Sequence, residues 1–298
     1  MSTFLILGAG PIGRAATKSL FNRRHQITVG TRSGTQVPGT TSLTLDATDV
    51  EALTQAAHGK EALIICTNPP YHRWPTEWLP VVESAIAAAK ATGARIVLMG
   101  NLYAYGKPDG RITAESPINP TEAKGQTRAE LWNRLLAAHQ EHGISVAELR
   151  ASDYFGPNAG PTTHLGSRFL DAIQEGKTTR VIGNPDVPHS WSYLPDIGEC
   201  LAILATHPEL SNRAWIGPSS GDASFREVAQ AIRPNAKVGA LPNIFLRFAG
   251  LFTPMVREVL AIRYQFTDRF LLDDSELRNA FNFTPTPLKK ALQETIAA

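Results

Sequence analysis

The stretch TFLILGAGPIG, residues 3–13, decides the fold of this chain. It begins with a short apolar run, Thr3–Leu7, which is typical of a strand buried on both faces. Glycines then follow in the spacing Gly-x-Gly-x-x-Gly, and a helical segment begins directly after them. In such a turn the first glycine permits a tight bend, the second lets the backbone approach a pyrophosphate, and the third lets helix and strand pack closely. The stretch predicts a dinucleotide site formed by Gly8, Gly10, Pro11, Ile12 and Gly13.

Segments of alternating character extend outward from this stretch through the first half of the chain. Further runs rich in apolar or β-branched residues are Gln26–Thr31, Ser42–Leu45, Ala62–Cys66, Arg95–Met99 and Ile144–Leu149. The helical segments between them are Pro11–Phe21, Asp49–Ala57, Glu77–Ala91 and Pro120–His142. Strands that alternate with helices indicate crossover connections and a parallel sheet. We therefore expect an α/β fold with a Rossmann-type doubly wound parallel sheet, whose ligands bind at the carboxyl ends of its strands.

The regular alternation loosens after Arg150, where turns rich in proline, glycine and asparagine separate shorter helical stretches. These helical stretches lie near Gly166–Gln174, Leu194–Thr206 and Phe225–Ile232. We expect a dinucleotide-binding Rossmann domain at residues 1–152, completed by about residues 186–216. Residues 153–185 and 217–298 are expected to form a smaller, mostly C-terminal α/β lobe that holds the substrate.

The composition points to a protein that acts on small molecules. The 298 residues carry a formal net charge of only +2, so no global field attracts nucleic acid. The most apolar late segment, residues 244–260, contains Arg247, Pro254 and Arg257. Because these residues interrupt it, the segment is too broken to span a bilayer. We expect a cytoplasmic protein with a small-molecule substrate and with neither nucleic-acid nor membrane partners.

The two cysteines give no sign of a metal site or a disulfide. Cys66 and Cys200 lie far apart in the sequence, and neither belongs to a Cys-x-x-Cys pair. We expect both to be buried free thiols and expect no metal site.

The choice of cofactor depends on the residues that follow the second predicted strand. An NAD site normally places Asp or Glu about 20 residues after the glycine loop, where the carboxylate holds a ribose hydroxyl. This chain has no acidic residue before Asp46, and Arg32 and Ser33 occupy the expected position. A guanidinium there can hold a 2′-phosphate through two hydrogen bonds, which favours NADP(H) over NAD(H). The alternative is that Arg32 is a solvated loop residue.

Further residues at the ends of predicted strands are expected near the cofactor. Asp46, after the third strand, is a candidate for binding the adenine amino group. Thr67 and Asn68, after the fourth strand, would lie near the middle of the cofactor. Asn68 also begins the aromatic loop NPPYHRW, residues 68–74, which would either close over a substrate or pack on its own domain.

Several later motifs occur in a familiar order. They are LDATD at 45–49, Tyr105-Gly106, LRASDYFGP at 149–157, SYLPDI at 192–197 and Phe283-Thr284-Pro285 before a last helix. Together with the glycine loop, they make the chain resemble an extended short-chain dehydrogenase/reductase of the NAD(P)-dependent epimerase/dehydratase type. The resemblance covers nearly the whole chain. It implies binding of a nicotinamide dinucleotide and a possible homodimer, in which Glu77–Ala91 and Pro120–His142 pair into a four-helix interface.

The resemblance also implies catalytic residues from which this chain departs. The family uses a Ser or Thr after the fifth strand and a Tyr-x-x-x-Lys on the next helix, where the tyrosine exchanges a proton with the substrate. Here Asn101 stands at the Ser/Thr position, Lys124 at that of the tyrosine and Arg128 at that of the lysine. Residues 103–107, YAYGK, spell the same pattern, but they precede a turn instead of lying on a helix. We expect an atypical member that lacks the usual pair.

The helix that carries these two cations is expected to begin near Pro120. Lys124 and Arg128 are four residues apart on one helical face, and that face continues to the apolar Leu131 and Leu135. We therefore expect both cations to point inward, where an anion such as a cofactor phosphate would offset their unfavourable position near a helix start. The alternative is that both are surface charges.

Two hypotheses for function remain. The first is an NADP(H)-binding oxidoreductase or redox isomerase whose proton donor is a desolvated Lys124, Tyr103 or His189. Asn101 and Arg128 complete its catalytic candidates. The second is a non-catalytic NADP(H)-binding sensor or regulatory protein, because loss of the Tyr-x-x-x-Lys pair is what such a role predicts.

Overall fold

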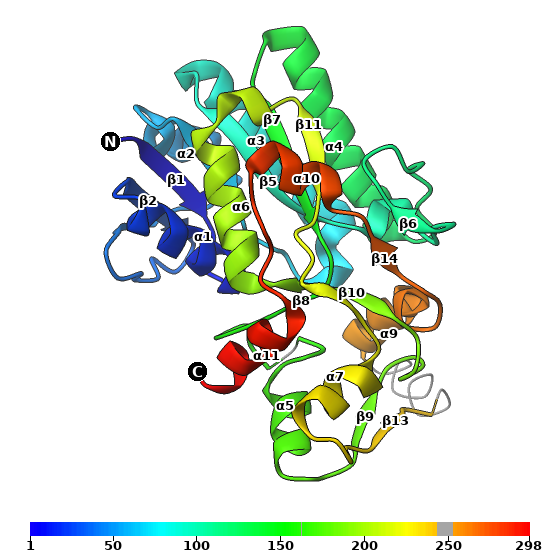
Figure 1. Cartoon of the computed structure of the whole chain (residues 1–298). Helices are drawn as coiled ribbons and strands as arrows, with labels where there is room; N and C mark the ends of the chain where they lie inside the picture. Colours follow the sequence, from blue (N-terminus) through cyan, green and yellow to red (C-terminus); the bar gives the residue numbers. More distant parts are fainter. Residues whose placement is uncertain (162, 243–252) are drawn as a thin grey trace.

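The computed structural model describes residues 1–161, 163–242 and 253–298, and its centre is a seven-stranded sheet in the order β11-β7-β5-β4-β1-β2-β3 (Figure 1). Its strands are β1 (Thr3–Leu7), β2 (Gln26–Thr31), β3 (Thr41–Thr44), β4 (Ala62–Ile65), β5 (Arg95–Asn101), β7 (Val146–Ala151) and β11 (Arg213–Ile216). Every neighbouring pair is parallel. The strand order reverses between β1 and β4, so the loops after these strands diverge and open a crevice. The predicted doubly wound sheet is confirmed.

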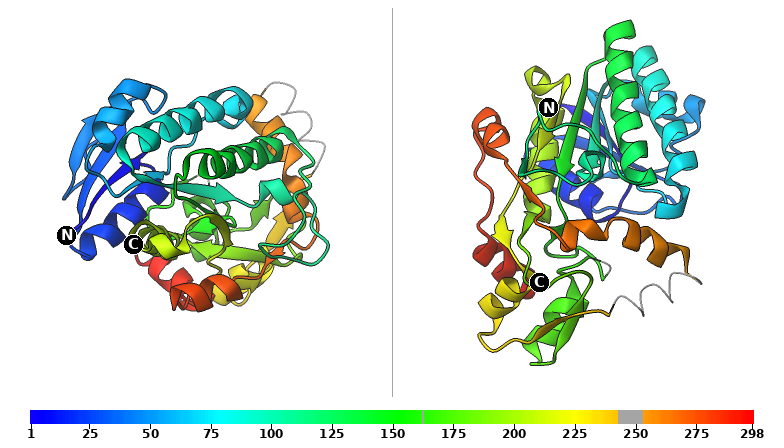
Figure 2. Two further views of the ribbon diagram at one scale, coloured as in Figure 1. Left: turned by 90° about the horizontal axis from the view of Figure 1, so that it is seen from above. Right: turned by 90° about the vertical axis from the view of Figure 1, so that its right-hand side faces the viewer.

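Helices cover both faces of this sheet, as the two views of Figure 2 show. One face is covered by α2 (Val50–Ala57), α3 (Trp74–Thr92) and α4 (Ala123–His142). The opposite face is covered by α1 (Pro11–Asn22) and α6 (Leu194–Thr206).

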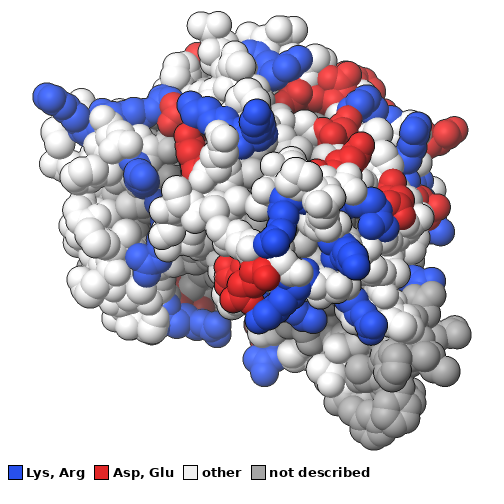
Figure 3. All heavy atoms as spheres, turned by 60° about the horizontal axis from the view of Figure 1, so that its bottom comes forward, with Lys and Arg blue, Asp and Glu red and all other residues white. Residues whose placement is uncertain are grey.

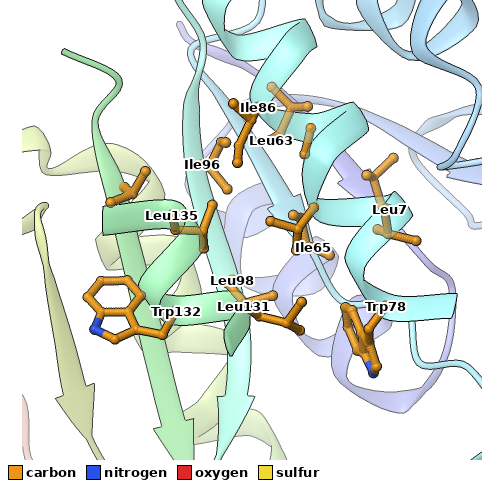
Figure 4. Close-up of a cluster of buried hydrophobic side chains, with 14 of the residues drawn as sticks. Leu7, Leu63, Ile65, Trp78, Ile86, Ile96, Leu98, Leu131, Trp132 and Leu135 are labelled. Carbon is orange, nitrogen blue, oxygen red and sulfur yellow. The ribbon is translucent and has the colours of Figure 1, made fainter. Parts of the chain in front are cut away.

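Each face of the sheet has its own hydrophobic core. Side chains along a strand alternate between its faces, so successive residues of β1 pack into one core and then the other. Leu5 and Leu7 pack against the layer of α3 and α4, whereas Phe4 and Ile6 pack against α1 and α6. Figure 4 shows the first of these cores, with Leu7 and Trp78 among its members. Because both faces are covered, the strand needs no polar residue, which explains the unbroken apolar run in the sequence.

Small sheets form a second layer of structure that comes mostly from the second half of the chain. Their orders are β12-β10-β8, β13-β9 and β14-β6. Their strands are β6 (Arg111–Ile112), β8 (Tyr154–Phe155), β9 (Thr179–Val181), β10 (His189–Tyr193), β12 (Gly221–Ala223), β13 (Val238–Ala240) and β14 (Leu271–Leu272). The accompanying helices are α5 (Ser167–Gln174), α7 (Phe225–Ile232), α9 (Pro254–Ala261), α10 (Ser275–Phe281) and α11 (Leu288–Ile296). A third core, which includes Phe155, Trp191 and Phe225, fills this part of the molecule.

Two helix starts differ by three residues from the sequence prediction. α4 begins at Ala123 and not at Pro120, because the side chain of Glu122 caps the helix by accepting hydrogen bonds from the backbone N–H groups of Lys124 and Gly125. α3 begins at Trp74, three residues before the predicted start at Glu77.

The apolar late segment at residues 244–260 lies mostly outside the described residues. Within the ranges that the structure does describe, no helix combines the length and the apolar character needed to cross a membrane.

Close packing between α1 and α6 gives a test of the fold. A Cβ placed on Gly198 of α6 would lie 2.5 Å from the backbone carbon of Ala15 in α1 and 2.6 Å from its carbonyl oxygen. We expect Gly198→Ala to lower the free energy of unfolding by about 1–3 kcal/mol, because helices this close must move apart. Urea denaturation measures the change. Gly239→Ala is the control, since the nearest atom to its added Cβ is 4.0 Å away; equal losses for the two variants would contradict the packing described.

Candidate dinucleotide and substrate cleft

A cleft of about 970 Å³ lies at the carboxyl ends of β1, β2, β4, β5 and β7. It extends from the glycine loop and Arg32 at one end, called here the nucleotide end, to Tyr71, Tyr103 and Asp153 at the other, called here the inner end. This is the edge of the sheet at which doubly wound folds bind their ligands. On the face of the molecule that Figure 3 shows, basic and acidic side chains are interspersed.

The glycine loop has the geometry that a bound pyrophosphate requires. A Cβ on Gly13 would lie 2.0 Å from the carbonyl oxygen of Gly8, so only glycine lets α1 approach β1 this closely. A Cβ on Gly10 would meet nothing within 4 Å, which leaves open space beside the backbone. Gly10 is also the N-cap of α1, and its position carries no side-chain cap that would compete with a phosphate for the first N–H groups of the helix. The loop therefore fits a dinucleotide.

Beyond the loop, the residues predicted for the nucleotide end also line the cleft. Arg32 and Ser33 follow β2 and are exposed in it. Asp46 accepts hydrogen bonds from the backbone N–H of Thr48 at 2.9 Å and from its hydroxyl at 2.8 Å. These bonds, with a smaller contribution from the charge of Arg32, lower the pKa of the Asp46 carboxyl. Asp46 is thus an anion held in a turn beside Arg32.

Thr67 and Asn68, which the sequence places near the middle of the cofactor, line the cleft, and so does Cys66. Both cysteines are free thiols, but only Cys200 is buried. Cys66 is only partly buried, against the predicted full burial, because it follows β4 directly and lines the cleft. Among the described residues no cluster of His, Cys, Asp or Glu is suited to a metal ion.

At the inner end, two tyrosines share a hydrogen bond. Tyr103 lies in a short 3-10 helix after β5, and its hydroxyl is 3.1 Å from that of Tyr71. Burial raises the pKa of Tyr103 well above that of a free phenol, so the residue carries its proton at neutral pH. Asn101 also lines the cleft, and its Oδ1 accepts a hydrogen bond from the backbone N–H of Tyr103 at 3.1 Å. Asn101 therefore fixes the turn that presents the tyrosine.

Lys124 is buried, which confirms its inward position, but it is not among the residues that line the cleft. Its Nζ lies 2.6 Å from Oε2 of Glu258 in α9 and 3.0 Å from Oε2 of Glu122. It also donates to the backbone carbonyl of Glu258 at 3.2 Å. Both carboxylates and a carbonyl thus engage this ammonium, and the residue joins α9 to the start of α4.

Arg128, four residues further along α4, is buried and does line the cleft. Its guanidinium carbon lies 4.5 Å from the ring centre of Trp74 and 4.3 Å from that of Trp78, and Nη1 donates to the carbonyl of Met99 at 3.1 Å. Burial lowers the pKa of Arg128 to about 10, which still leaves it charged at neutral pH. A positive charge therefore lies at the wall of the cleft, supported by two aromatic rings.

His189 does not reach the cleft itself. It is buried, and its Nε2 lies 3.0 Å from Oδ2 of Asp153, which does line the cleft. From the sequence, Asp153 was expected to face the nicotinamide region or to cap its turn, and neither Asp153 nor Tyr71 was given a catalytic role. The sequence signal for Tyr71 was the aromatic loop at residues 68–74. Its tryptophan, Trp74, packs into the core.

Taken together, a parallel sheet and a glycine loop at the mouth of a cleft define a Rossmann-type dinucleotide-binding protein. A sequence profile of the NAD dependent epimerase/dehydratase family matches residues 4–216. The chain therefore belongs to this family, whose cofactor is a nicotinamide dinucleotide.

Comparison with individual proteins agrees with this assignment. A dTDP-glucose 4,6-dehydratase from Streptomyces niveus is 24% identical over 200 residues, which are 67% of this chain and 55% of that protein. The chain thus spans about half the length of this relative. A UDP-glucose 4-epimerase from Thermotoga maritima superposes with a TM-score of 0.79 at 13% identity, covering 99% of this chain and 97% of the other. A UDP-glucuronic acid 4-epimerase from Bacillus cereus, solved with NAD, gives 0.79 at 14% identity, with coverage of 99% and 97%. At these identities the likeness shows the fold alone.

The ion pairs of Lys124 give a second prediction. Lys124→Met would leave the carboxylates of Glu122 and Glu258 close together without their cation. We expect a loss of about 3 kcal/mol in the free energy of unfolding, less than for a fully buried pair because Glu258 is partly exposed. Chemical denaturation measures it, and Lys107→Met, in an exposed turn, is the control. If both variants were as stable as the unmodified protein, the ion pairs of Lys124 would not stabilise the contact between α4 and α9.

Proposed function

We propose that this protein binds NADP(H) in the cleft and acts as an oxidoreductase or redox isomerase of the epimerase/dehydratase kind on a small molecule. The observation that carries the proposal is one continuous cleft, with the glycine loop at its nucleotide end and the Tyr71–Tyr103 pair at its inner end. When bound, the dinucleotide accepts or delivers a hydride, and the protein must supply placement and a proton.

The preference for NADP(H) rests on the nucleotide end. Arg32 is exposed in the cleft directly after β2, where an NAD site would place a carboxylate. Asp46, the nearest acidic residue in the sequence after the loop, is held by the turn at Thr48. A 2′-phosphate at this position would therefore meet a guanidinium without a competing carboxylate from the end of β2.

Tyr103 is the proton donor that the geometry favours. It lines the cleft, keeps its proton at neutral pH and receives a hydrogen-bond partner in Tyr71. The charge of Arg128 lowers the pKa of Tyr103 and so opposes the effect of burial, which parallels the effect of lysine on tyrosine in the family. Asn101 holds the turn that carries Tyr103, and His189 contacts the cleft only through Asp153. We assign Lys124 a structural role because two carboxylates already engage it.

A second candidate function is a sensor that binds NADP(H) without turnover. The observation in its favour is that Lys124, which we place at the position of the family's tyrosine, is ion-paired and does not line the cleft. It therefore gives the cleft no proton donor.

One titration and one screen separate these functions. NADPH and NADH are titrated against the purified protein, and turnover is then followed over carbonyl compounds and nucleotide sugars. We expect tighter binding of NADPH and turnover of at least one substrate. Tight NADPH binding with no turnover would favour the sensor, and NADH binding as tight as NADPH would contradict the cofactor preference.

The role of Arg32 is tested by its removal. We expect Arg32→Ala to raise the Kd for NADPH about tenfold, because the 2′-phosphate loses its cation, and to change the Kd for NADH little. Isothermal titration calorimetry measures both constants. Arg180→Ala, on the exposed side of β9, is the matched control. Equal weakening of NADPH and NADH would mean that Arg32 does not read the phosphate.

The role of Tyr103 is tested by removing only its hydroxyl. We expect Tyr103→Phe to lower kcat about 100-fold on a substrate found in the screen, with the Kd for NADPH unchanged. Tyr193→Phe is the control, since that hydroxyl donates to Glu294 at 2.7 Å and lies away from the cleft. Full activity of Tyr103→Phe would show that another group supplies the proton.

A further inference from the structure

The hydrogen bonds of His189 determine which of its ring nitrogens carry a hydrogen. Its Nδ1 lies 3.1 Å from the backbone carbonyl oxygen of Gln265. A carbonyl oxygen can only accept, so Nδ1 must carry a hydrogen. In a neutral ring Nε2 would then be an unprotonated acceptor.

This acceptor would face another acceptor. Nε2 lies 3.0 Å from Oδ2 of Asp153 and 3.2 Å from Oγ of Ser152. The serine hydroxyl can donate to a bare Nε2, but a carboxylate oxygen at hydrogen-bond distance from that lone pair is repulsive. A proton between Nε2 and Oδ2 turns this repulsion into a charge-assisted hydrogen bond. The geometry therefore requires one proton more than a neutral imidazole and a carboxylate carry.

The surroundings favour the nitrogen as the place of this proton. Burial by itself raises the pKa of the Asp153 carboxyl, but the hydrogen bond and charge of His189, with the charge of His164, outweigh it and lower the pKa. The His189 ring is stacked against Phe266, with 4.8 Å between ring centres, and Phe270, at 5.6 Å. Aromatic faces of this kind accommodate a cation.

Asp153 alone of this pair is open to the cleft. Its side chain keeps a fifth of its surface exposed, against 2% for His189. The other titratable groups that interact with it are His164, whose Nε2 lies 3.8 Å from Oδ1, and the phenols of Tyr71, Tyr103, Tyr154 and Tyr264. Burial and the charge of Asp153 raise the pKa of each of these phenols, so they are donors while Asp153 is an acceptor.

We propose that Asp153 is the catalytic base of the inner end and that His189 is a positioning residue, an imidazolium that keeps Asp153 ionised and oriented. This inference rests on the proposed function and adds a second group to it. A substrate hydroxyl would give its proton to Oδ1 of Asp153, so that one O–H bond breaks and another forms. In the reverse direction the neutral acid returns the same proton. Tyr103 and Asp153 are thus two separate proton-exchanging groups, and each returns in one direction the proton that it takes in the other.

The protonation state is tested without cofactor or substrate. In protein labelled with ¹⁵N at histidine, the ring nitrogens of His189 are observed by NMR at pH 7 and assigned through His189→Gln. We expect both nitrogens to be protonated, and we expect Asp153→Asn to leave the ring neutral with its proton on Nδ1. Ser152→Ala should leave the imidazolium unchanged, and Asp186→Asn, at an exposed surface pair, is the control. A neutral ring in the unmodified protein would overturn the proposal.

Kinetics then test the roles of the two residues. Asp153→Asn should lower kcat about 100-fold with the Kd for NADPH unchanged. His189→Gln should move the acidic limb of the kcat/KM profile to higher pH, because Asp153 loses the cation that lowers its pKa; a purely structural residue would lower activity without moving that limb. Full activity of Asp153→Asn would exclude it as the base. Failure of NADPH to bind would reject the proposed function while leaving the NMR result intact, so the two failures are distinguishable.

Discussion

The contact between Gly13 and Gly8 is the constraint on which the rest of the structure depends. A single added methyl group at Gly13 would lie 2.0 Å from the carbonyl oxygen of Gly8, so the start of α1 is held directly against the end of β1. That contact aims the free N–H groups of the helix along the edge of the sheet. It also fixes the position from which the cleft extends across the strand ends to the tyrosines.

The two cations of α4 have different surroundings at the inner end. Lys124 is engaged by two carboxylates, and Arg128 lies on the rings of Trp74 and Trp78 at the wall of the cleft. The polar groups that line the cleft come instead from loops after β4, β5 and β7, which carry Tyr71, Tyr103 and Asp153. A fold that gathers strand ends at one edge can exchange the donor of a proton without altering its framework.

The sequence predicted the sheet well because periodicity and glycine spacing are local signals. The limits of β1 and β2 agree with the prediction to the residue. The start of α4 was misplaced because Pro120 is a good first residue for a helix, whereas the actual cap is the side chain of Glu122, whose conformation no pattern records. The residues of the pairs Tyr71–Tyr103 and Asp153–His189 lie 32 and 36 positions apart in the chain, and only the fold brings them together. Most strands of the second half were missed because two or three residues carry no period, and β10 and β11, with five and four residues, were missed as well.

The position of β11 has a consequence for how the molecule assembles. This strand completes the edge of the main sheet beside β7, yet it follows β8, β9 and β10 in the chain. A nascent chain that had emerged only as far as residue 152 would lack both this strand and α6, and α1 alone would cover the apolar residues of β1 and β4 on that face. The main sheet is therefore completed only by segments that follow the one carrying His189, and the order of the chain does not match the order of the strands.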